Sequence, residues 1–526
     1  MECMEGSQQQ VQHGIEELPD GSTYEGQFLG RDRHGWGKIT WASGDCYEGQ
    51  FQCSAMHGQG ALRWDTGVAY SGQWQSNELG PAGTMKWPDG RQYRGHFLDG
   101  EKHGEGRLTW PDGRSYTGQW SGGLQDGYGF IAARKGPSNL SQWEGGGLVR
   151  WLPEEELPAL PVAERAAVAL GCGAVRLLSA MWLSQRPDSY ILHRRRELPP
   201  EAFVRPDEAL DMMEKRYSVV VVSYTWLSQD HPDPAGFHTR ILVRYLTKHL
   251  QFFSGFDDVG VFWDYVSLHQ TGGPRPKGGK YDPSRGEEEE KLRAIGLQAL
   301  PYFYGGKKTV VVKLTRMPEA CDLVPYDCRG WCFAESTISG MVKESGQFLD
   351  LGLAAKALSD ESLDWEQLRD AAIAIRHPPL LPEDMAHALE RMTVTQGDDR
   401  GLLCGLYAGF FAEVTTSAIF LGLANSRPEA MGWGDTEMKL FCRALPSFTS
   451  CKALSLANHG NLSKAGVRSL RERLPQLPAL QRLVLPRHLE ESKEGQQLAK
   501  EWSDAGKTPD RLVWLQRLGE MPRIVW

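Results

Sequence analysis

The sequence lacks the short motifs that mark the common classes of enzyme and metal site. It has no Cys-x-x-Cys pair, no HExxH, no GxxxxGK[ST] loop and no GxSxG elbow. This excludes the usual signatures of zinc sites, P-loop nucleotide binding and α/β-hydrolases. Its start carries no secretory signal. We therefore expect its ten cysteines to be free thiols in a reducing, cytoplasmic compartment.

The sequence also has no excess of positive charge and few long apolar runs. The formal net charge of the 526 residues is −9, so we expect no nucleic-acid partner. One stretch, Gly405–Ala424, is long enough to span a bilayer, but Glu413 lies near its middle. Because a carboxylate in lipid costs several kcal/mol, we predict a core helix there instead.

A 23-residue repeat occupies the first quarter of the chain. A tyrosine is followed two residues later by glycine and four residues later by Phe or Trp; the tyrosines are Tyr24, Tyr47, Tyr70, Tyr93 and Tyr116. Each repeat continues with a Gly-x-Gly-x-Leu-x-Trp-like stretch, such as Gly35–Trp41 with Ile39 at the apolar position, and the fifth repeat lacks the final Trp. Apolar and polar residues alternate, which predicts strands with one packed face. The W-P-D-G at Trp87–Gly90 and Trp110–Gly113 favours a turn, so each repeat predicts a β-hairpin.

Successive hairpins should stack into a long twisted sheet. One hairpin cannot bury its own aromatic rings, and the inner-face glycines would leave room for the neighbouring rings. The third repeat has Pro81 where the others have glycine, and we expect a local distortion there. A degenerate sixth repeat follows at Trp143–Gly145.

The pattern Tyr-x-Gly-x-Phe/Trp followed by Gly-x-Gly-x-Leu-x-Trp resembles MORN repeats. The resemblance implies a scaffold or dimerisation module, or a link to membrane lipids. Between Asp20 and Phe130 there are 13 acidic and 10 basic residues. Phosphoinositide binding depends on clustered Lys and Arg, so we expect protein partners here. Membrane-lipid recruitment and a purely architectural spacer are the alternatives.

Strands and helices alternate in the middle of the chain. Pro-rich breaks at Leu152–Pro161 and Leu198–Pro200 frame a predicted helix, Val162–Gln185. The run Tyr217–Trp226 then has the β-branched composition of a buried strand. The following segments are predicted as helix Phe237–Phe253, strand Val259–Val266, loop Thr271–Arg285, helix Glu287–Leu300 and strand Lys308–Leu314. This alternation predicts a parallel sheet with helices on both faces.

Three short segments of the middle domain indicate more than the order of its strands and helices. Ser223–Trp226 reads SYTW, Trp263–Tyr265 reads WDY and Arg329–Glu335 reads RGWCFAE. In this order they resemble the TIR domain and its fungal relative, the heterokaryon-incompatibility domain. The departures are the loop Thr271–Arg285 and the insert His231–Pro234. The resemblance implies a self-association module, and some TIR domains hydrolyse NAD.

The resemblance also names a candidate site. Ligands of doubly wound sheets lie beyond the carboxyl ends of the strands. If the domain hydrolysed NAD, Glu335 would be the catalytic carboxylate, steadying an oxocarbenium-like centre. NAD, as substrate rather than cofactor, would be held by Tyr224, Trp226, Trp263 and Asp264. The alternative is a structural Glu335 that caps its helix or pairs with Arg329.

No metal site is expected in the middle domain. His231, His238 and His269 lie near the same edge of the predicted sheet, but no ligand spacing links them. We therefore expect these three residues to be surface or core histidines.

The C-terminal part is predicted to be mainly helical over Leu358–Asn425. Leu454-x-Leu456 is echoed 29 residues later by Leu483-x-Leu485, with a predicted helix at Lys464–Leu474 between them. This resembles one unit of a ribonuclease-inhibitor-type leucine-rich repeat. An ordinary β-α-β fragment is the alternative.

Together these patterns predict a multidomain α+β protein. We expect a disordered N-terminus (1–19), a repeat array (20–148), a Pro-rich and helical linker (149–200), a TIR-like α/β domain (201–350), a helical region (355–445) and a leucine-rich-repeat-like unit with a tail (446–526). We expect an intracellular scaffold or signalling adaptor with protein partners and self-association. The alternative is an NAD glycohydrolase.

Overall fold

The computed structural model describes residues 11–134, 138–228, 231–253, 257–269, 283–319, 323–394, 399–427 and 432–515. The chain forms two compact units. The array unit comprises Met1–Leu157, Val168–Ala174 and Arg205–Asp207. The α/β unit comprises Pro158–Ala167, Val175–Val204 and Glu208–Trp526.

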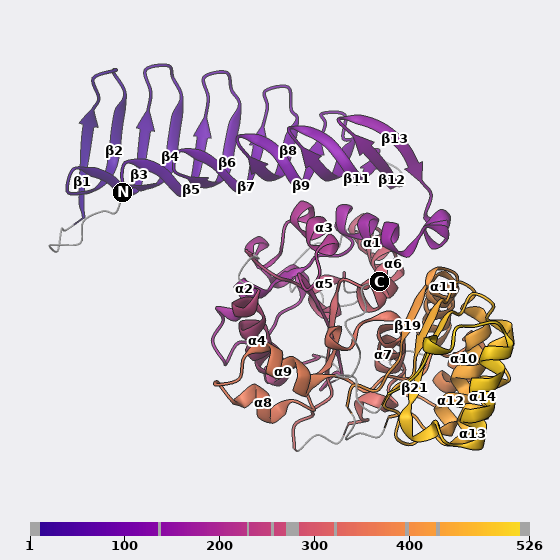
Figure 1. Ribbon diagram of the computed structural model, residues 1–526. Coiled ribbons are helices and arrows are strands. Elements are labelled where there is room, and N and C mark those ends of the chain that lie inside the picture. The colour runs from indigo at the N-terminus through magenta and orange to yellow at the C-terminus, as the bar shows by residue number, and fades with distance from the viewer. Residues whose placement is uncertain are drawn as a thin grey trace. The chain divides into compact units, whose positions relative to one another are not determined.

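The array unit is built on one antiparallel sheet of 13 strands, paired in chain order (Figure 1). The strands are β1 (Gln12–Glu17), β2 (Thr23–Leu29), β3 (Asp32–Thr40), β4 (Cys46–Gln52), β5 (Ala55–Arg63), β6 (Ala69–Gln75), β7 (Glu78–Lys86), β8 (Gln92–Leu98), β9 (Glu101–Thr109), β10 (Ser115–Ser121), β11 (Leu124–Ala132), β12 (Ser138–Glu144) and β13 (Gly147–Leu152). The predicted stack of hairpins is therefore confirmed. The degenerate sixth repeat forms the hairpin β12–β13.

The array begins earlier than predicted. Strand β1 pairs with β2 along Gln12–Glu17, a stretch that we expected to be disordered. Its Gln-rich surroundings hid a strand whose Gly14 lies over the ring of Phe28, where an added Cβ would be 3.4 Å from the ring. The disorder predicted for residues 1–10 lies outside the described residues.

Edge-to-face aromatic contacts run along the whole array. The ring centroid of Tyr24 lies 5.0 Å from that of Phe28 in the same strand and 5.1 Å from that of Phe51 in the next repeat. The same two contacts recur at each tyrosine up to Tyr116, whose second neighbour is Trp143. Such a pair contributes about 0.5–1.5 kcal/mol beyond the area it buries. Each repeat is thus held to the next through its tyrosine.

Each tyrosine also fixes a β-bulge in its own strand. Tyr24 Oη donates to the carbonyl of Gln27 at 2.9 Å, where the register of β2 against β3 shifts. Gln27 Oε1 accepts from the Trp36 N–H at 2.8 Å. The hydroxyl bond recurs in every repeat, with the carbonyl acceptors Gln27, Gln50, Gln73, His96 and Gln119.

Glycines make room for these rings, as predicted. An ideal Cβ at Gly37 would lie 2.3 Å from Tyr24 Oη, and one at Gly60 would lie 2.3 Å from Tyr47 Oη. No side chain can be placed at these distances without moving a tyrosine that has no free surface.

The distortion predicted for the third repeat at Pro81 stays a prediction. The matching residue of the second repeat, Gly58, has a φ of +65° and pairs with Trp74. Proline is fixed near a φ of about −65° and cannot adopt that left-handed conformation. Beyond Pro81, the ladder between β7 and β8 runs from Ala82 opposite His96 to Lys86 opposite Gln92.

The first sheet of the α/β unit has the strand order β14-β16-β15-β17-β18. The strands are β14 (Leu178–Ser179), β15 (Val219–Tyr224), β16 (Gly260–Phe262), β17 (Val310–Leu314) and β18 (Phe348–Asp350). Strand β14 is antiparallel to β16, and the other pairs are parallel. Every residue of β15 to β18 is buried, which fits a sheet with both faces covered. The predicted parallel sheet is confirmed.

The helices between residues 162 and 417 are α1 (Val162–Gly171), α2 (Ala180–Ser184), α3 (Pro206–Glu214), α4 (Phe237–Phe252), α5 (Asp264–Ser267), α6 (Pro283–Gly305), α7 (Gly330–Val342), α8 (Ala355–Ser359), α9 (Trp365–Ala372), α10 (Pro382–Glu390) and α11 (Asp399–Ser417). The helix predicted over Val162–Gln185 is instead two helices, because α1 ends at Gly171 and α2 begins at Ala180. Between them Gly173 adopts a φ of +75°, and the chain turns towards β14.

Two further predicted boundaries are wrong. The strand predicted over Val259–Val266 ends at Phe262, because Ser267 Oγ accepts the Trp263 N–H at 3.0 Å and the chain enters α5. The helix predicted to stop before Pro301 continues to Gly305. Phe303 stacks on Phe262 with ring centroids 4.3 Å apart, so tertiary packing outweighs the one N–H that proline removes.

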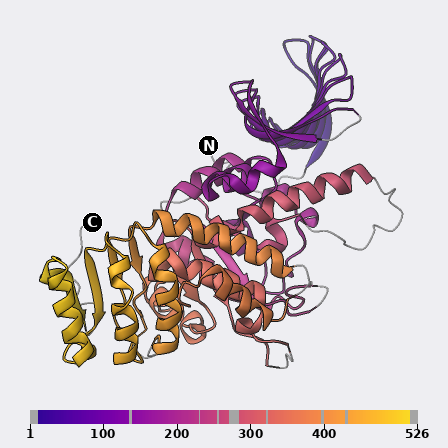
Figure 2. The same ribbon diagram turned by 90° about the vertical axis from the view of Figure 1, so that its right-hand side faces the viewer.

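A second, parallel sheet ends the described chain, with strands in sequence order. Its elements are β19 (Phe420–Gly422), α12 (Asp435–Ala444), β20 (Ala453–Ser455), α13 (Lys464–Arg471), β21 (Arg482–Pro486), α14 (Lys493–Asp504) and β22 (Leu512–Leu515). Its orange-to-yellow helices stand side by side in Figure 2.

The C-terminal sheet is larger than the single unit predicted. Leu454 pairs with Leu483, as the 29-residue offset implied, and Leu483 pairs with Leu512 at the same offset. Strand β22 has Leu512-x-Trp514 in place of Leu-x-Leu, and Leu421-x-Leu423 at β19 lies 33 residues before Leu454-x-Leu456 instead of 29, so neither strand was predicted. The helix predicted over Gly405–Ala424 ends at Ser417, before β19. Among the described residues, no helix has the length and apolar character needed to cross a membrane.

Among the cysteines that the structure describes, all but one match the expectation of free thiols. Those that are free are Cys46, Cys172, Cys328, Cys332, Cys404, Cys442 and Cys451. Cys53 takes part in a disulfide, so the prediction is wrong for that residue. No Cys-x-x-Cys spacing marked it in the sequence.

The packing of the array predicts that valine substitutions at two neighbouring positions of β6 have very different effects on stability. A Cβ at Gly72 would lie 2.5 Å from Gly83 Cα, so Gly72→Val should lower the free energy of unfolding by about 1–3 kcal/mol. Ser71 is exposed on the same strand, and Ser71→Val should change stability little. Denaturant unfolding followed by tryptophan fluorescence measures both; equal effects would contradict the packing described here.

Candidate functional site

Charged and hydroxyl side chains gather at the carboxyl ends of the parallel strands of the α/β unit. Tyr224 ends β15, Asp264 follows β16 and Asp350 ends β18. Helix α7 and the segment before it add further groups. We call this set the carboxyl-edge cluster: Ser223, Tyr224, Asp264, Lys313, Tyr326, Glu335 and Asp350. It occupies the edge at which ligands of doubly wound sheets bind.

Glu335 is held by hydroxyl groups. Ser223 Oγ donates to Glu335 Oε2 at 2.5 Å and also hydrogen-bonds to the Tyr326 hydroxyl. Burial raises the pKa of the Glu335 carboxyl to about 8, and hydrogen bonds from Ser223 and Tyr304 only partly oppose that shift. The carboxyl group is therefore mostly protonated at neutral pH.

The structural roles expected for Glu335 are both wrong. Helix α7 begins at Gly330 and has no acidic residue in its first turn, so Glu335 does not cap it. Arg329 Nε donates instead to the carbonyl of Val324 at 3.1 Å. The side chain points to Ser223 on β15, because α7 packs across that strand.

Two of the residues predicted to hold NAD bond to each other. Tyr224 Oη donates to Asp264 Oδ1 at 2.7 Å, and burial raises the pKa of that carboxyl. Trp226 is half-buried and meets Tyr265 edge to face, with ring centroids 6.0 Å apart. Trp263 is fully buried against Tyr224, with centroids 5.3 Å apart, and so has no ring face to offer a ligand. Its predicted stacking role is therefore corrected to core packing.

Lys313, Asp350 and Tyr326 were missed in the sequence. Lys313 Nζ lies 3.9 Å from Asp350 Oδ2, 3.8 Å from Asp327 Oδ1 and 4.8 Å from the Tyr326 ring centroid. The sequence did mark two of these residues. Lys313 stands inside the apolar run KTVVVKL and Asp350 closes FLD, and charged residues are unusual in buried strands.

The three histidines near this edge have separate environments. His231 Nδ1 accepts from the Asp233 N–H at 2.9 Å, and Nε2 donates to Leu192 O at 3.0 Å. His238 is fully buried, and burial lowers its pKa to about 4. His269 follows α5. Over the residues the structure describes, no group of three or more His, Cys, Asp or Glu is arranged to hold a metal ion. The predicted loop Thr271–Arg285 lies outside the described residues up to residue 282.

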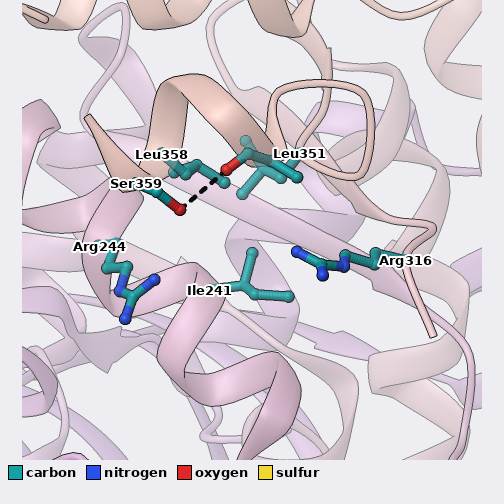
Figure 3. Close-up of a pocket in the computed structure, with 7 residues that line it drawn as sticks. Ile241, Arg244, Arg316, Leu351, Leu358 and Ser359 are labelled. Carbon is teal, nitrogen blue, oxygen red and sulfur yellow. Dashed lines mark hydrogen bonds between the residues drawn. The ribbon is translucent and has the colours of Figure 1, made fainter. Parts of the chain in front are cut away.

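A small pocket with a volume of about 30 Å³ lies at the same edge, and Glu335 does not line it. It is lined by Ile241, Arg244, Arg316, Leu351, Ala355, Leu358 and Ser359. Figure 3 shows Arg244 and Arg316 on opposite sides of Ile241. None of the predicted site residues lines this pocket; Glu335 is half-buried, and its carboxyl accepts hydrogen bonds from the hydroxyls of Ser223 and Tyr304.

Comparison with known families identifies the array and leaves the other resemblances as predictions. Comparison with curated proteins finds none with a significant match. The family model described as MORN repeat matches residues 24–46, 47–68, 70–90, 93–113 and 116–132. That match covers neither the TIR-like segment nor the leucine-rich-repeat-like segment. The N-terminal array of this chain therefore consists of five MORN repeats, followed by a sixth hairpin that the family model does not cover.

Proposed function

We propose that the protein is an adaptor that works by association, through its MORN array and a TIR-like α/β unit. The observation that carries the proposal is a group of exposed apolar side chains in the last strands of the array, which we call the apolar patch: Leu124, Leu148, Val149 and Trp151. These four side chains are 41–52% exposed, and Leu124 lies over the turn that leads into β13. Exposed apolar patches mark sites of protein association.

A second copy of the chain is the simplest occupant of this patch. An isologous contact brings the same surface of two molecules together, so one apolar patch serves both sides. MORN repeats commonly mediate interactions with proteins or lipids, and an apolar surface without clustered cations suits a protein.

The strand order supports a TIR-like α/β unit. Numbered along the chain, the parallel strands β16, β15, β17 and β18 stand in the order 2-1-3-4, which is the flavodoxin-like order. The half-buried Glu335, whose carboxyl is mostly protonated at neutral pH, favours an association role for this unit. The NAD glycohydrolase alternative draws support from the place of Glu335 at the carboxyl edge and from the accessible ring of Trp226.

Removing the apolar patch should weaken self-association. We expect the sedimentation coefficient of the full-length protein to rise with concentration, and Val149→Lys combined with Trp151→Lys to abolish the rise. Ile419 is 57% exposed outside the patch, so Ile419→Lys is the matched control and should behave as wild type. Identical behaviour of the patch variant and wild type would refute this surface.

The array should bind phosphoinositide vesicles weakly at physiological salt. Its residues 20–130 carry a net charge of −3, and anionic lipids attract clustered cations. Liposome sedimentation measures this directly. Glu25 and Glu48 are exposed, so Glu25→Lys with Glu48→Lys is a positive control that should raise binding. Micromolar binding by the unaltered protein would make membrane recruitment the leading function.

The substitution Glu335→Gln distinguishes the proposed adaptor function from the alternative NAD glycohydrolase function. We expect no release of nicotinamide from NAD by the full-length protein, even when concentrated or clustered on beads. Folded Glu335 keeps its proton up to pH about 8, whereas the unfolded chain loses it near 4.5. Stability of the wild type should therefore fall as pH rises between these values, and Glu335→Gln should lose that part of the fall.

Unfolding midpoints at pH 5 and pH 8 measure the effect of this substitution. Glu366 is exposed, and Glu366→Gln should follow the wild type. Nicotinamide release that rises with pH through about 8 and disappears in Glu335→Gln would establish the enzyme instead.

A further inference from the structure

Four half-buried tryptophans occupy the same position in successive repeats of the array. Each directly follows the second strand of its repeat, and each donates its backbone N–H to the carbonyl four residues later, at 2.9–3.0 Å. We call them the tryptophan row: Trp41, Trp64, Trp87 and Trp110. All four side chains pack against the aromatic core of the array and remain partly open to solvent. The row therefore lies on the same face of the sheet as the buried tyrosines.

The spacing of the tryptophan row follows from the sheet. Consecutive members lie two strands apart, because the hairpins succeed one another along the array (Figure 1). Neighbouring strands are about 4.7–4.9 Å apart, so the tryptophans recur about every 9.4–9.8 Å. A polyproline II helix has three residues per turn and rises about 3.1 Å per residue, so it repeats about every 9.3 Å. A proline-rich segment lying along the array would thus present every third residue to a tryptophan.

The turn residue four positions after each tryptophan differs between the repeats. In the third repeat it is Arg91, whose guanidinium carbon lies over the Trp87 ring, 5.5 Å from its centroid. The fourth repeat has the same arginine–tryptophan contact at 5.6 Å. In the first and second repeats the residue is Asp45 and Val68, so no arginine covers the ring from that position. A ligand can therefore stack on the first two tryptophans without displacing a turn arginine.

The charges beside the tryptophan row also divide along the array. The turns of the first two repeats contain Asp45 and Asp65 and no lysine or arginine. In the third repeat, Arg91 Nε donates to Asp89 Oδ2 at 2.6 Å, and the fourth repeat has the same pair at 2.7 Å. The turn carboxylates are thus paired with a cation in only the third and fourth of these turns. A ligand that fits this distribution carries positive charge at the end that meets the first two repeats.

We propose that the tryptophan row binds a proline-rich segment of a partner protein in the polyproline II conformation, with lysine or arginine beside the prolines that stack on Trp41 and Trp64. Such helices dock on aromatic surfaces at low entropic cost, because they are ordered before they bind. Their backbone carbonyls have no internal hydrogen bonds, and the guanidinium groups of Arg91 and Arg114 supply donors. The row shares no residue with the apolar patch, so this proposal and the proposed self-association can fail separately.

The test follows the fluorescence anisotropy of a labelled peptide, two lysines followed by four Pro-Ala-Ala triplets, as full-length protein is added. We expect saturable binding, and weaker binding of a peptide of the same composition whose prolines are adjacent, because those prolines cannot reach several tryptophans. Trp64→Ala should lower the affinity for the regular peptide by about tenfold, a loss typical of an interface tryptophan. Trp36 is 55% exposed and, five residues before Trp41, lies on the opposite face of the sheet. Trp36→Ala is therefore the matched control and should bind as wild type.

A second variant keeps the proposal testable if Trp64→Ala does not fold. Asp65 is exposed, so Asp65→Lys should leave the core intact. It should weaken binding of the lysine peptide by about threefold, whereas a peptide with serines in place of the lysines should bind both proteins equally. Equal binding of the regular and the grouped peptide would overturn the proposal, because the period carries it. So would equal losses in the two tryptophan variants, or no binding by the wild type.

Discussion

The packing of each buried tyrosine against a pair of glycines is the constraint on which the array depends. The ring needs the space that a Cβ would fill, and the hydroxyl needs the carbonyl that the bulge turns inwards. Both needs are met only when the residue two positions on and its cross-strand partner, Gly26 and Gly37 in the first repeat, are glycines. The edge-to-face contact with the next repeat then follows, because the same ring reaches the aromatic residue of the neighbouring hairpin.

The α/β unit places its polar groups differently. At the carboxyl edge of its sheet, burial keeps the Glu335 carboxyl mostly protonated while hydroxyl groups hydrogen-bond to it, and Lys313 lies between Asp350 and Asp327. The polar groups at the carboxyl edge, where enzymes of related fold bind their substrates, therefore bond to one another. At the end of helix α7, by contrast, the two buried cations Lys343 and Arg376 bond, among the described residues, only to backbone carbonyl and hydroxyl groups.

Sequence patterns predicted the array in detail and the α/β unit in outline. The 23-residue period predicted the strands and turns of the array, because each repeat confirms the others. Local composition failed where distant packing decides the outcome. Phe303 carries α6 past Pro301, and Ser267 closes α5 where a strand was expected.

The site was predicted only in part for the same reason. The motifs located Glu335, Tyr224 and Asp264 at one edge, but whether a side chain is enclosed depends on partners far away in the chain. Trp263 looked like a stacking platform because its neighbours in sequence resemble a motif, and it is buried by contacts that no local pattern records.

The central claim is that this protein acts by association through the end of its array. Hydrogen exchange of the full-length protein at low and high concentration tests it directly, because an interface protects the backbone amides that it covers. The account predicts added protection at high concentration in β13 and its turn from β12, with no change around Glu335 when NAD is added. Protection around Glu335 on adding NAD, with no concentration-dependent protection in β13, would contradict it.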